Sequence, residues 1–225
     1  MTEDTQPVAR GSRSTPAGLF PLVGAVLCAG IASLIYEVVW IRQLGLSLGS
    51  TAVAFSVMLS AFLGGLARGG WFMGRRADTD PFPARTLAWV EVAAAILGVL
   101  SIPALTLAGR AYVWLALSVA GGPVLSLVLR SAIALAVMLL PAILFGMTFP
   151  LATVVGGRLM HGRKAAAIVS AASSFGSAIG ALLCGLWLEP AYGLFTSAAI
   201  GAGFNLLAAA SAFSLHAKAR SSDKR

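Results

Sequence analysis

Apolar runs of roughly 20 residues, separated by short polar segments, recur along most of the chain. A helix needs about 20 consecutive apolar residues to cross a hydrocarbon core about 30 Å thick. Of the 225 residues, 58% are hydrophobic and 11% are charged. A soluble domain usually has about a quarter of its residues charged. The pattern therefore predicts an all-α integral membrane protein that crosses the bilayer several times.

We expect a bundle of six transmembrane helices within residues 18–215. Residues 1–17 are rich in Ser, Thr and Pro and are predicted to be a disordered tail, and residues 216–225 to be a basic tail. The segment 111–123 ends in Gly-Gly-Pro and is expected to lie at the membrane interface. The six spans are expected at about 19–45, 50–73, 85–109, 125–150, 165–188 and 191–215.

The basic residues behind the net charge of +8 cluster in the two tails and in the loops after the second and fourth predicted spans. The opposite side of the predicted bundle carries Arg42, Arg110 and Arg130. The positive-inside rule then predicts that both termini face the cytoplasm. Because no face combines basic and aromatic residues in a way that would follow phosphates, we expect lipid and not nucleic acid as the partner.

Cysteine and histidine usage does not indicate a metal site or a disulfide framework. Cys28 and Cys184 both lie within apolar runs, and there is no CxxC motif. No combination of a nucleophile with a neighbouring base is evident either. We therefore expect no metal, no cofactor and no catalytic residues in this chain.

Small residues recur at four-residue spacing in two of the predicted spans. Gly65 and Gly69 lie in the second span, and Gly176 and Gly180 lie in the fifth. Glycine at this spacing lets helix backbones approach closely in lipid. The pattern predicts tight helix packing, and a sliding interface of the kind used by transporters is the alternative.

Five segments, taken in order, resemble one family. They are "AGIASLIYEVVWIRQLGLSLGST", "AFLGGLARGGWFMGRRAD", "WVEVAAAILG", "LLPAILFGMTFPL" and "FGSAIGALLCGLWLEPAYGL". The first carries a Y-E-x-x-W-x-R pattern and the fourth a P-x-x-x-x-G-x-x-x-P pattern. Together they resemble the membrane part of bacterial fused spermidine-synthase-like proteins, which are major-facilitator-like. The residues that match the two patterns are Tyr36, Glu37, Trp40 and Arg42, and Pro141, Gly146 and Pro150.

This resemblance implies a half-facilitator module in a bacterial inner membrane. Six spans are half of a typical facilitator, so a homo-oligomer or another membrane subunit is the expected partner. Asp78, with Arg75, looks like the acidic position of the facilitator loop motif; the residues themselves suggest that Asp78 caps a helix start. Arg68 and the pair at 173–174 depart from the family pattern. The aminopropyltransferase domain of the family does not follow the spans, so we do not expect polyamine synthesis.

Charged residues inside the predicted spans are the candidate functional residues, because an ionisable group in a bilayer is costly unless it is paired or used. Glu37 lies roughly 27 Å from the cytoplasmic start of its span, at about 1.5 Å per residue. We expect Arg130 to pair with it, while Arg42 snorkels outward. Near the cytoplasmic side we expect a second pair, between Arg68 and Glu91.

Two interpretations of Glu37 stay open. It is either a protonatable or cation-binding carboxylate in an outward-facing cavity, beside Tyr36 and Trp40, or a permanently paired structural ion. Likewise, Pro141, Gly146 and Pro150 either break the fourth span at a binding site or only kink it.

The expected function follows from these residues and from the resemblance. It is a transporter-like module for a small solute, an organic cation or a polyamine-related compound. The alternative is a non-transporting scaffold or accessory subunit of a membrane complex or of a separate spermidine-synthase-like enzyme.

Overall fold

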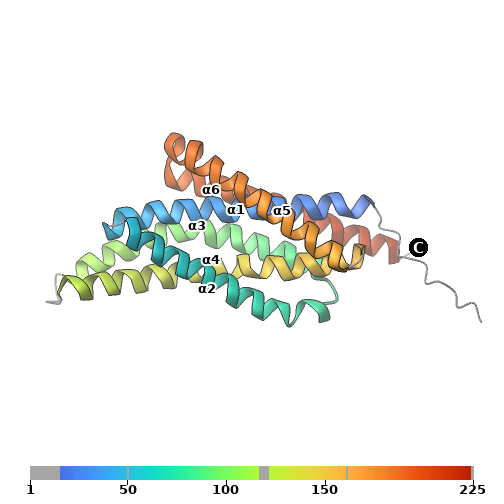
Figure 1. The fold of residues 1–225 in the computed structure, drawn as a ribbon, viewed down its shortest axis with the longest axis horizontal. Helices are drawn as coiled ribbons and strands as arrows, with labels where there is room; N and C mark the ends of the chain where they lie inside the picture. The colour runs from blue at the N-terminus through green and yellow to red at the C-terminus, as the bar shows by residue number, and fades with distance from the viewer. Residues whose placement is uncertain (1–15, 50, 117–121, 161, 224–225) are drawn as a thin grey trace, which may run out of the picture.

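The computed structural model describes residues 16–49, 51–116, 122–160 and 162–223, and this part of the chain folds into helices and contains no strand. The long helices lie side by side along one axis (Figure 1). In chain order the elements are α1 (Pro16–Leu48), α2 (Thr51–Gly74), the 3₁₀-helix η1 (Ala77–Thr79), α3 (Pro83–Ala116), α4 (Pro123–Leu159), α5 (Gly162–Leu183), the π-helix η2 (Cys184–Leu188) and α6 (Glu189–Asp223). The all-α prediction is confirmed.

Five helical stretches are long and apolar enough to cross a membrane within the described residues. The last of these, Arg163–Lys218, contains α5, η2 and α6 together. The backbone leaves the helical conformation within it at Gly193, where φ is 75° and ψ is 176°. Glycine adopts this conformation without the steric cost that a Cβ atom imposes. In Figure 1 the chain reverses direction between α5 and α6, and each of the two helices packs along α1.

Both ends of the described chain lie at the same end of the bundle (Figure 1). This end, which we call the terminal end, contains the first residue of α1, the last of α6, η1 and the α4–α5 connection. The opposite, distal end contains the end of α1, the end of α3, the start of α4 and the turn at Gly193.

Three helices are longer than the sequence predicts. α3 continues as a helix to Ala116, so the first part of the predicted interfacial segment 111–123 belongs to α3, and residues 117–121 lie outside the described residues. α4 continues to Leu159, and α6 reaches Asp223, into the predicted basic tail. The predicted disordered tail falls almost wholly outside the described residues, and α1 begins at Pro16.

Helix α4 is continuous through Pro141 and Pro150, so of the two alternatives for these residues and Gly146, a break or a kink, the break is not seen. A membrane helix tolerates proline when neighbouring helices support the turn that has lost a hydrogen bond. Here α2 and α3 both pack along α4. Gly146 serves that packing, because a Cβ atom on it would collide with the backbone of Leu66 on α2.

The predicted small-residue packing is confirmed at two helix pairs. On α2, a Cβ atom at Gly65 would meet Ala142, and one at Gly69 would meet the backbone of Ile143 on α4. On α5, Cβ atoms at Gly176 and Gly180 would run into backbone carbonyls of α1. Close backbone contact increases the dispersion attraction between helices. This matters in lipid, where no hydrophobic driving force brings helices together.

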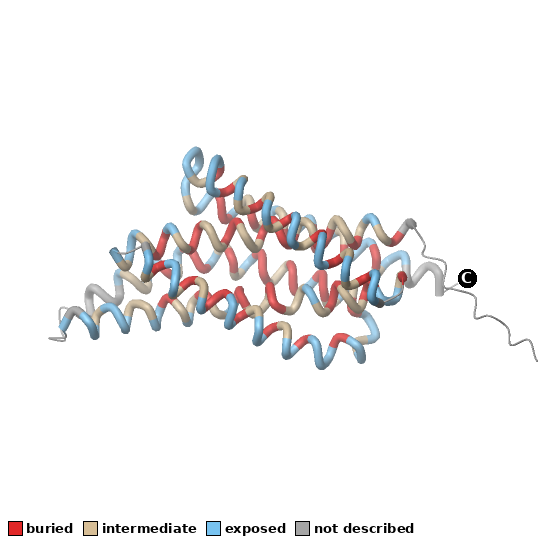
Figure 2. Tube along the Cα trace, viewed as in Figure 1, coloured by how far each residue is buried: buried red, intermediate tan, exposed pale blue. Residues whose placement is uncertain are grey.

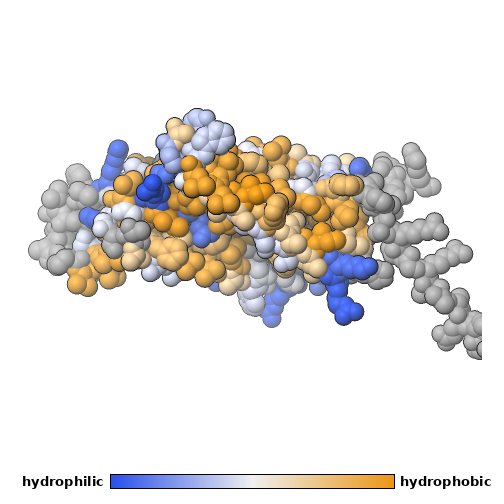
Figure 3. All heavy atoms as spheres, turned by 45° about the horizontal axis from the view of Figure 1, so that its top comes forward, coloured by the Kyte–Doolittle hydropathy of each residue, from blue (hydrophilic) through white to orange (hydrophobic). Residues whose placement is uncertain are grey.

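Buried residues run along the axis of the bundle and exposed ones cover its outside (Figure 2). The outside is nevertheless apolar: the face in Figure 3 is mostly hydrophobic along its length. Leu63, Trp71, Leu107 and Leu186 are among the large apolar side chains that are more than half exposed. A surface of this kind is stable against acyl chains and would aggregate in water. Length, composition and surface together indicate a multi-pass membrane protein.

Candidate functional site

The central polar site of the bundle is built around Glu91 on α3, whose side chain is only 1% exposed. Thr148 on α4 donates a hydrogen bond of 2.7 Å from Oγ1 to Glu91 Oε1. Asn205 on α6 donates one of 2.7 Å from Nδ2 to Glu91 Oε2. Both carboxylate oxygens are therefore bound by neutral donors from two different helices.

The predicted pair of Arg68 with Glu91 is wrong. Arg68 is exposed on the outside of α2. The two helices follow each other in the chain, but α3 packs on α4 and α6, whereas α2 packs on α4. Glu91 consequently faces into the bundle, while Arg68 faces out of it.

Two features of this site leave hydrogen-bonding capacity for a further proton. Thr148 Oγ1 also lies 3.5 Å from the Leu144 carbonyl, so its hydroxyl has a second acceptor toward which it can turn. Asn205 Oδ1 is buried and accepts no hydrogen bond within the described part of the chain. A buried acceptor without a donor is costly. The site thus contains one acceptor more than the described donors satisfy.

A cavity of about 250 Å³ reaches Thr148 from the side of α1, α2 and α5. We call it the central cavity. Its walls combine the aromatic rings of Phe62 and Phe145 with hydroxyl groups of Ser33, Ser173 and Ser177. Thr148 is therefore shared between this cavity and the Glu91 carboxylate. Such a position allows the hydroxyl to relay a change in the cavity to Glu91.

Tyr36 and Trp40 are buried in the core of the helix bundle. They line neither the central cavity nor the larger cavity that is described below. Trp40 Nε1 donates to Ser101 Oγ at 2.7 Å, and the Tyr36 hydroxyl donates to the Ala95 carbonyl at 3.4 Å. The ring centroid of Trp40 lies 6.4 Å from that of Phe145, and the ring centroid of Tyr36 lies 5.7 Å from it. Residues four apart share one side of a helix, and here that side of α1 faces Ala95 and Ser101 on α3. The packing interpretation of these aromatics fits this geometry.

The predicted ion pair of Glu37 with Arg130 is wrong. Glu37 is half-buried on α1, and no ion pair or hydrogen bond joins its carboxylate to the described residues. Arg130 instead donates from Nη1 to the Ser47 carbonyl at 3.2 Å. Ser47 lies ten residues beyond Glu37, or about 15 Å along α1 at 1.5 Å per residue. The two charges therefore differ in depth.

The ion pair that forms in the described part of the chain joins Arg42 Nη2 to Glu189 Oε2 at 3.1 Å. It connects the distal parts of α1 and α6. The Arg42 side chain is 63% exposed. The guanidinium of the pair therefore lies at the surface of the bundle, and the outward snorkelling of Arg42 stays a prediction.

The hairpin between α2 and α3 is ordered by Asp80, not by the predicted Asp78, which is exposed. Asp80 Oδ1 accepts a hydrogen bond of 2.8 Å from the Phe82 amide, an Asx turn. Arg158, at the end of α4, donates to the carbonyls of Asp80 and Pro81. Arg75 lies over the ring of Trp71, at 4.7 Å from its centroid.

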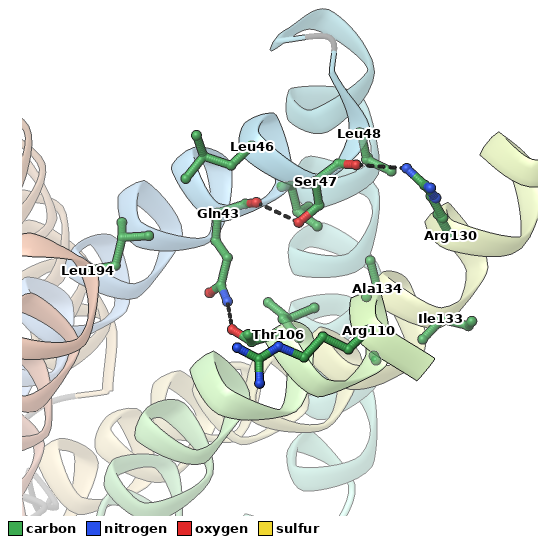
Figure 4. A pocket seen from close by; sticks show the side chains of 14 residues that line it. Gln43, Leu46, Ser47, Leu48, Thr106, Arg110, Arg130, Ile133, Ala134 and Leu194 are labelled. Carbon is green, nitrogen blue, oxygen red and sulfur yellow. Dashed lines mark hydrogen bonds between the residues drawn. The ribbon is translucent and has the colours of Figure 1, made fainter. Parts of the chain in front are cut away.

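A larger cavity of about 540 Å³ lies at the distal end between α1, α3 and α4 (Figure 4). We call it the distal cavity. Polar groups of Gln43, Ser47 and Thr106 line it together with Arg110 and Arg130. Gln43 Nε2 donates to Thr106 Oγ1 at 3.0 Å and to the Ile102 carbonyl at 2.8 Å. The remaining wall is apolar.

Sequence reasoning missed Thr148, Asn205 and Gln43. Thr148 and Asn205 are single polar side chains in otherwise apolar runs, which was the available signal, whereas Gln43 directly follows Arg42. Comparison with known proteins adds no assignment: no protein-family model, no curated protein and no solved structure matches the chain. The resemblance drawn from the five segments stays a prediction.

Proposed function

We propose that this protein is a transporter-like membrane module that moves a small solute and uses Glu91 as its proton- or cation-binding group. The observation that carries the proposal is the buried carboxylate of Glu91, held by Thr148 and Asn205 without a cationic partner in the described part of the chain. Intramembrane carboxylates are costly and usually serve ion or proton pathways. A structural role alone would be met by an apolar side chain.

The proposal includes six crossings with both termini in the cytoplasm. Two antiparallel helices, α5 and α6, in the last apolar stretch support the sixth crossing (Figure 1). The terminal end carries Arg75, Arg76, Arg85, Arg158, Arg163, Lys164 and Lys218, and the distal end Arg42, Arg110 and Arg130. By the positive-inside rule the terminal end is cytoplasmic.

The charge of the central site favours a cationic solute or a coupled proton. Glu91 is the one fully buried carboxyl side chain among the described residues, and a carboxyl group is either neutral or negative. Phe62 and Phe145 in the central cavity offer aromatic faces to an organic cation. A polyamine-related solute, which the resemblance implies, is such a cation. We also propose, from the resemblance alone, a bacterial inner membrane as the location.

A single chain of this size supplies half the helices of a facilitator, so we propose that it works as a homo-oligomer or with another membrane subunit. The competing function is a scaffold or accessory subunit that carries no solute.

Uptake into proteoliposomes tests the proposal. Purified protein would be reconstituted and supplied with radiolabelled putrescine or spermidine, with and without an imposed pH gradient. We expect uptake by the wild type and loss of at least ten-fold in Glu91→Gln. Glu37→Gln is the matched control, because Glu37 lies outside the hydrogen-bonded site, and it should retain uptake.

Two results would contradict the proposal. Equal uptake by Glu91→Gln and the wild type would remove Glu91 from the mechanism. Absence of uptake by the wild type, together with a stable membrane protein that copurifies from native membranes, would favour the scaffold.

A further inference from the structure

Two arginines line the distal cavity, and none of the described residues that line it is acidic. Arg110 of α3 and Arg130 of α4 both line it. In Figure 4 the Arg110 side chain extends beside Thr106 and Gln43. Glu189, the described acidic residue at this end, is already paired with Arg42. The cavity is therefore electropositive and suits an anionic group.

A second, independent feature is an unsatisfied acceptor in the same wall. Gln43 is 7% exposed, and both of its side-chain hydrogen bonds within the described residues use Nε2 as the donor. Its Oε1 is buried and has no partner among the described residues. Because this oxygen has no accessible surface, a ligand reaches it only when the Gln43 amide turns toward the cavity; the matching ligand then carries a hydroxyl or ammonium group besides its anion.

The third feature is the apolar rim. Leu46 and Ile133 line the cavity and are 81% and 36% exposed on the lipid-covered surface. The remaining lining is mostly aliphatic. The arginines lie near helix ends, which is the depth of lipid headgroups. An amphiphile could thus place its head inside the cavity and its chains along the rim.

We propose that the distal cavity binds an anionic phospholipid whose headgroup carries a hydrogen-bond donor. Its phosphate contacts Arg110 and Arg130 at the cavity wall, and a headgroup hydroxyl donates to Gln43 Oε1 when that amide turns toward the cavity. This site does not depend on whether the protein transports a solute. It fixes the distal ends of α1, α3 and α4 to the lipid leaflet on that side.

The experiment measures lipid binding to the purified full chain in detergent, by native mass spectrometry and by the rise in melting temperature on titration. The probes are phosphatidylglycerol, which has an anion and hydroxyl donors, phosphatidylmethanol, which has the anion alone, and phosphatidylcholine. Glycerol phosphate and inorganic phosphate represent soluble anions. We expect phosphatidylglycerol to bind about ten-fold more tightly than phosphatidylcholine, with phosphatidylmethanol between them.

Arg110→Gln tests the contact without threatening the fold, because this side chain is exposed. We expect it to weaken phosphatidylglycerol binding five- to ten-fold, and Arg110→Gln with Arg130→Gln to abolish the preference over phosphatidylcholine. Arg85→Gln, an exposed arginine at the other end of α3, is the matched control and should bind normally. Melting curves without lipid show that each variant is folded.

Three outcomes would overturn the proposal. The first is an unchanged lipid preference in folded Arg110→Gln and in the folded double variant. The second is an equal loss in Arg85→Gln, which would indicate general surface attraction. The third is binding of glycerol phosphate or inorganic phosphate as tight as that of phosphatidylglycerol, which would identify the ligand as a soluble anion.

Discussion

Thr148 and Glu91 lie 57 residues apart on different helices, yet the Thr148 hydroxyl donates to Glu91 Oε1 at 2.7 Å. Thr148 also lines the central cavity. Asn205 closes the site from the other side through Glu91 Oε2. Three helices thus meet at one carboxylate, and substitutions there distinguish the roles of charge and hydrogen bonding.

Neutralising Glu91 is expected to preserve or raise stability. In Glu91→Gln the amide oxygen still accepts from Thr148, and its NH₂ group donates to Asn205 Oδ1 once that amide turns over. The variant therefore removes a buried charge, while the turned Asn205 amide exchanges one unpaired group, Oδ1, for another, Nδ2. We expect a melting temperature in detergent equal to or above that of the wild type. A drop of more than 5 °C would contradict this.

Removing a donor from the site has the opposite effect. Asn205→Leu leaves Glu91 Oε2 without its partner, and a hydrogen bond to a charged group contributes about 1.5–3 kcal/mol. One kcal/mol shifts the melting temperature by about 2–4 °C at this chain length. We expect Asn205→Leu to melt about 5 °C lower than the wild type. Combined with Glu91→Gln, most of the loss should disappear, because the charge that needed the donor is gone.

The α2–α4 contact depends on glycine at defined positions. Gly69→Ala would place a methyl group against the Ile143 carbonyl and force the helices apart. We expect a lower melting temperature and a smaller monodisperse fraction on size-exclusion chromatography. Gly64→Ala is the matched control, because a Cβ atom there meets nothing within 4 Å. It should be neutral or slightly stabilising, since alanine favours helix by up to about 1 kcal/mol. Equal effects of the two substitutions would refute the packing argument.

The buried indole N–H of Trp40 needs Ser101 Oγ as its hydrogen-bond acceptor. Ser101→Ala removes the oxygen to which Trp40 Nε1 donates and leaves a buried N–H group unpaired, at a cost of about 1–3 kcal/mol. We expect a lower melting temperature. Ser56→Ala, which removes an exposed hydroxyl bonded only to its own helix, should change it by less than about 1 °C. Similar melting for the two variants would argue against a structural role for the Trp40 bond.

The α2–α3 hairpin is expected to open when Arg158 is replaced. Arg158→Ala removes two hydrogen bonds to the carbonyls of Asp80 and Pro81. Limited trypsin digestion should then cut faster at Arg75, Arg76 or Arg85, by several-fold. Arg163→Ala, also exposed near the same end, serves as the control. Unchanged cleavage in Arg158→Ala would show that the Asx turn at Asp80 suffices.

Hydrophobic periodicity and length predicted the helical class, the approximate helix ranges and the membrane setting. These are local properties, because a run of about 20 apolar residues needs lipid wherever it packs. Glycine spacing likewise predicted close packing at Gly65, Gly69, Gly176 and Gly180, since a missing Cβ atom acts within its own helix face. Helix ends were less predictable: α3, α4 and α6 continue past the hydrophobic runs.

The partners of the charged residues were decided only by the tertiary structure. The sequence identified Glu37, Glu91, Arg68 and Arg130 as costly in lipid, but chain order suggested pairs that do not form. Which helices touch depends on the rotation of each helix about its axis and on the order in which all of them pack, and a single amphipathic pattern does not record either. Glu91 finds Thr148 and Asn205 because α3 packs between α4 and α6, a relation among three distant segments.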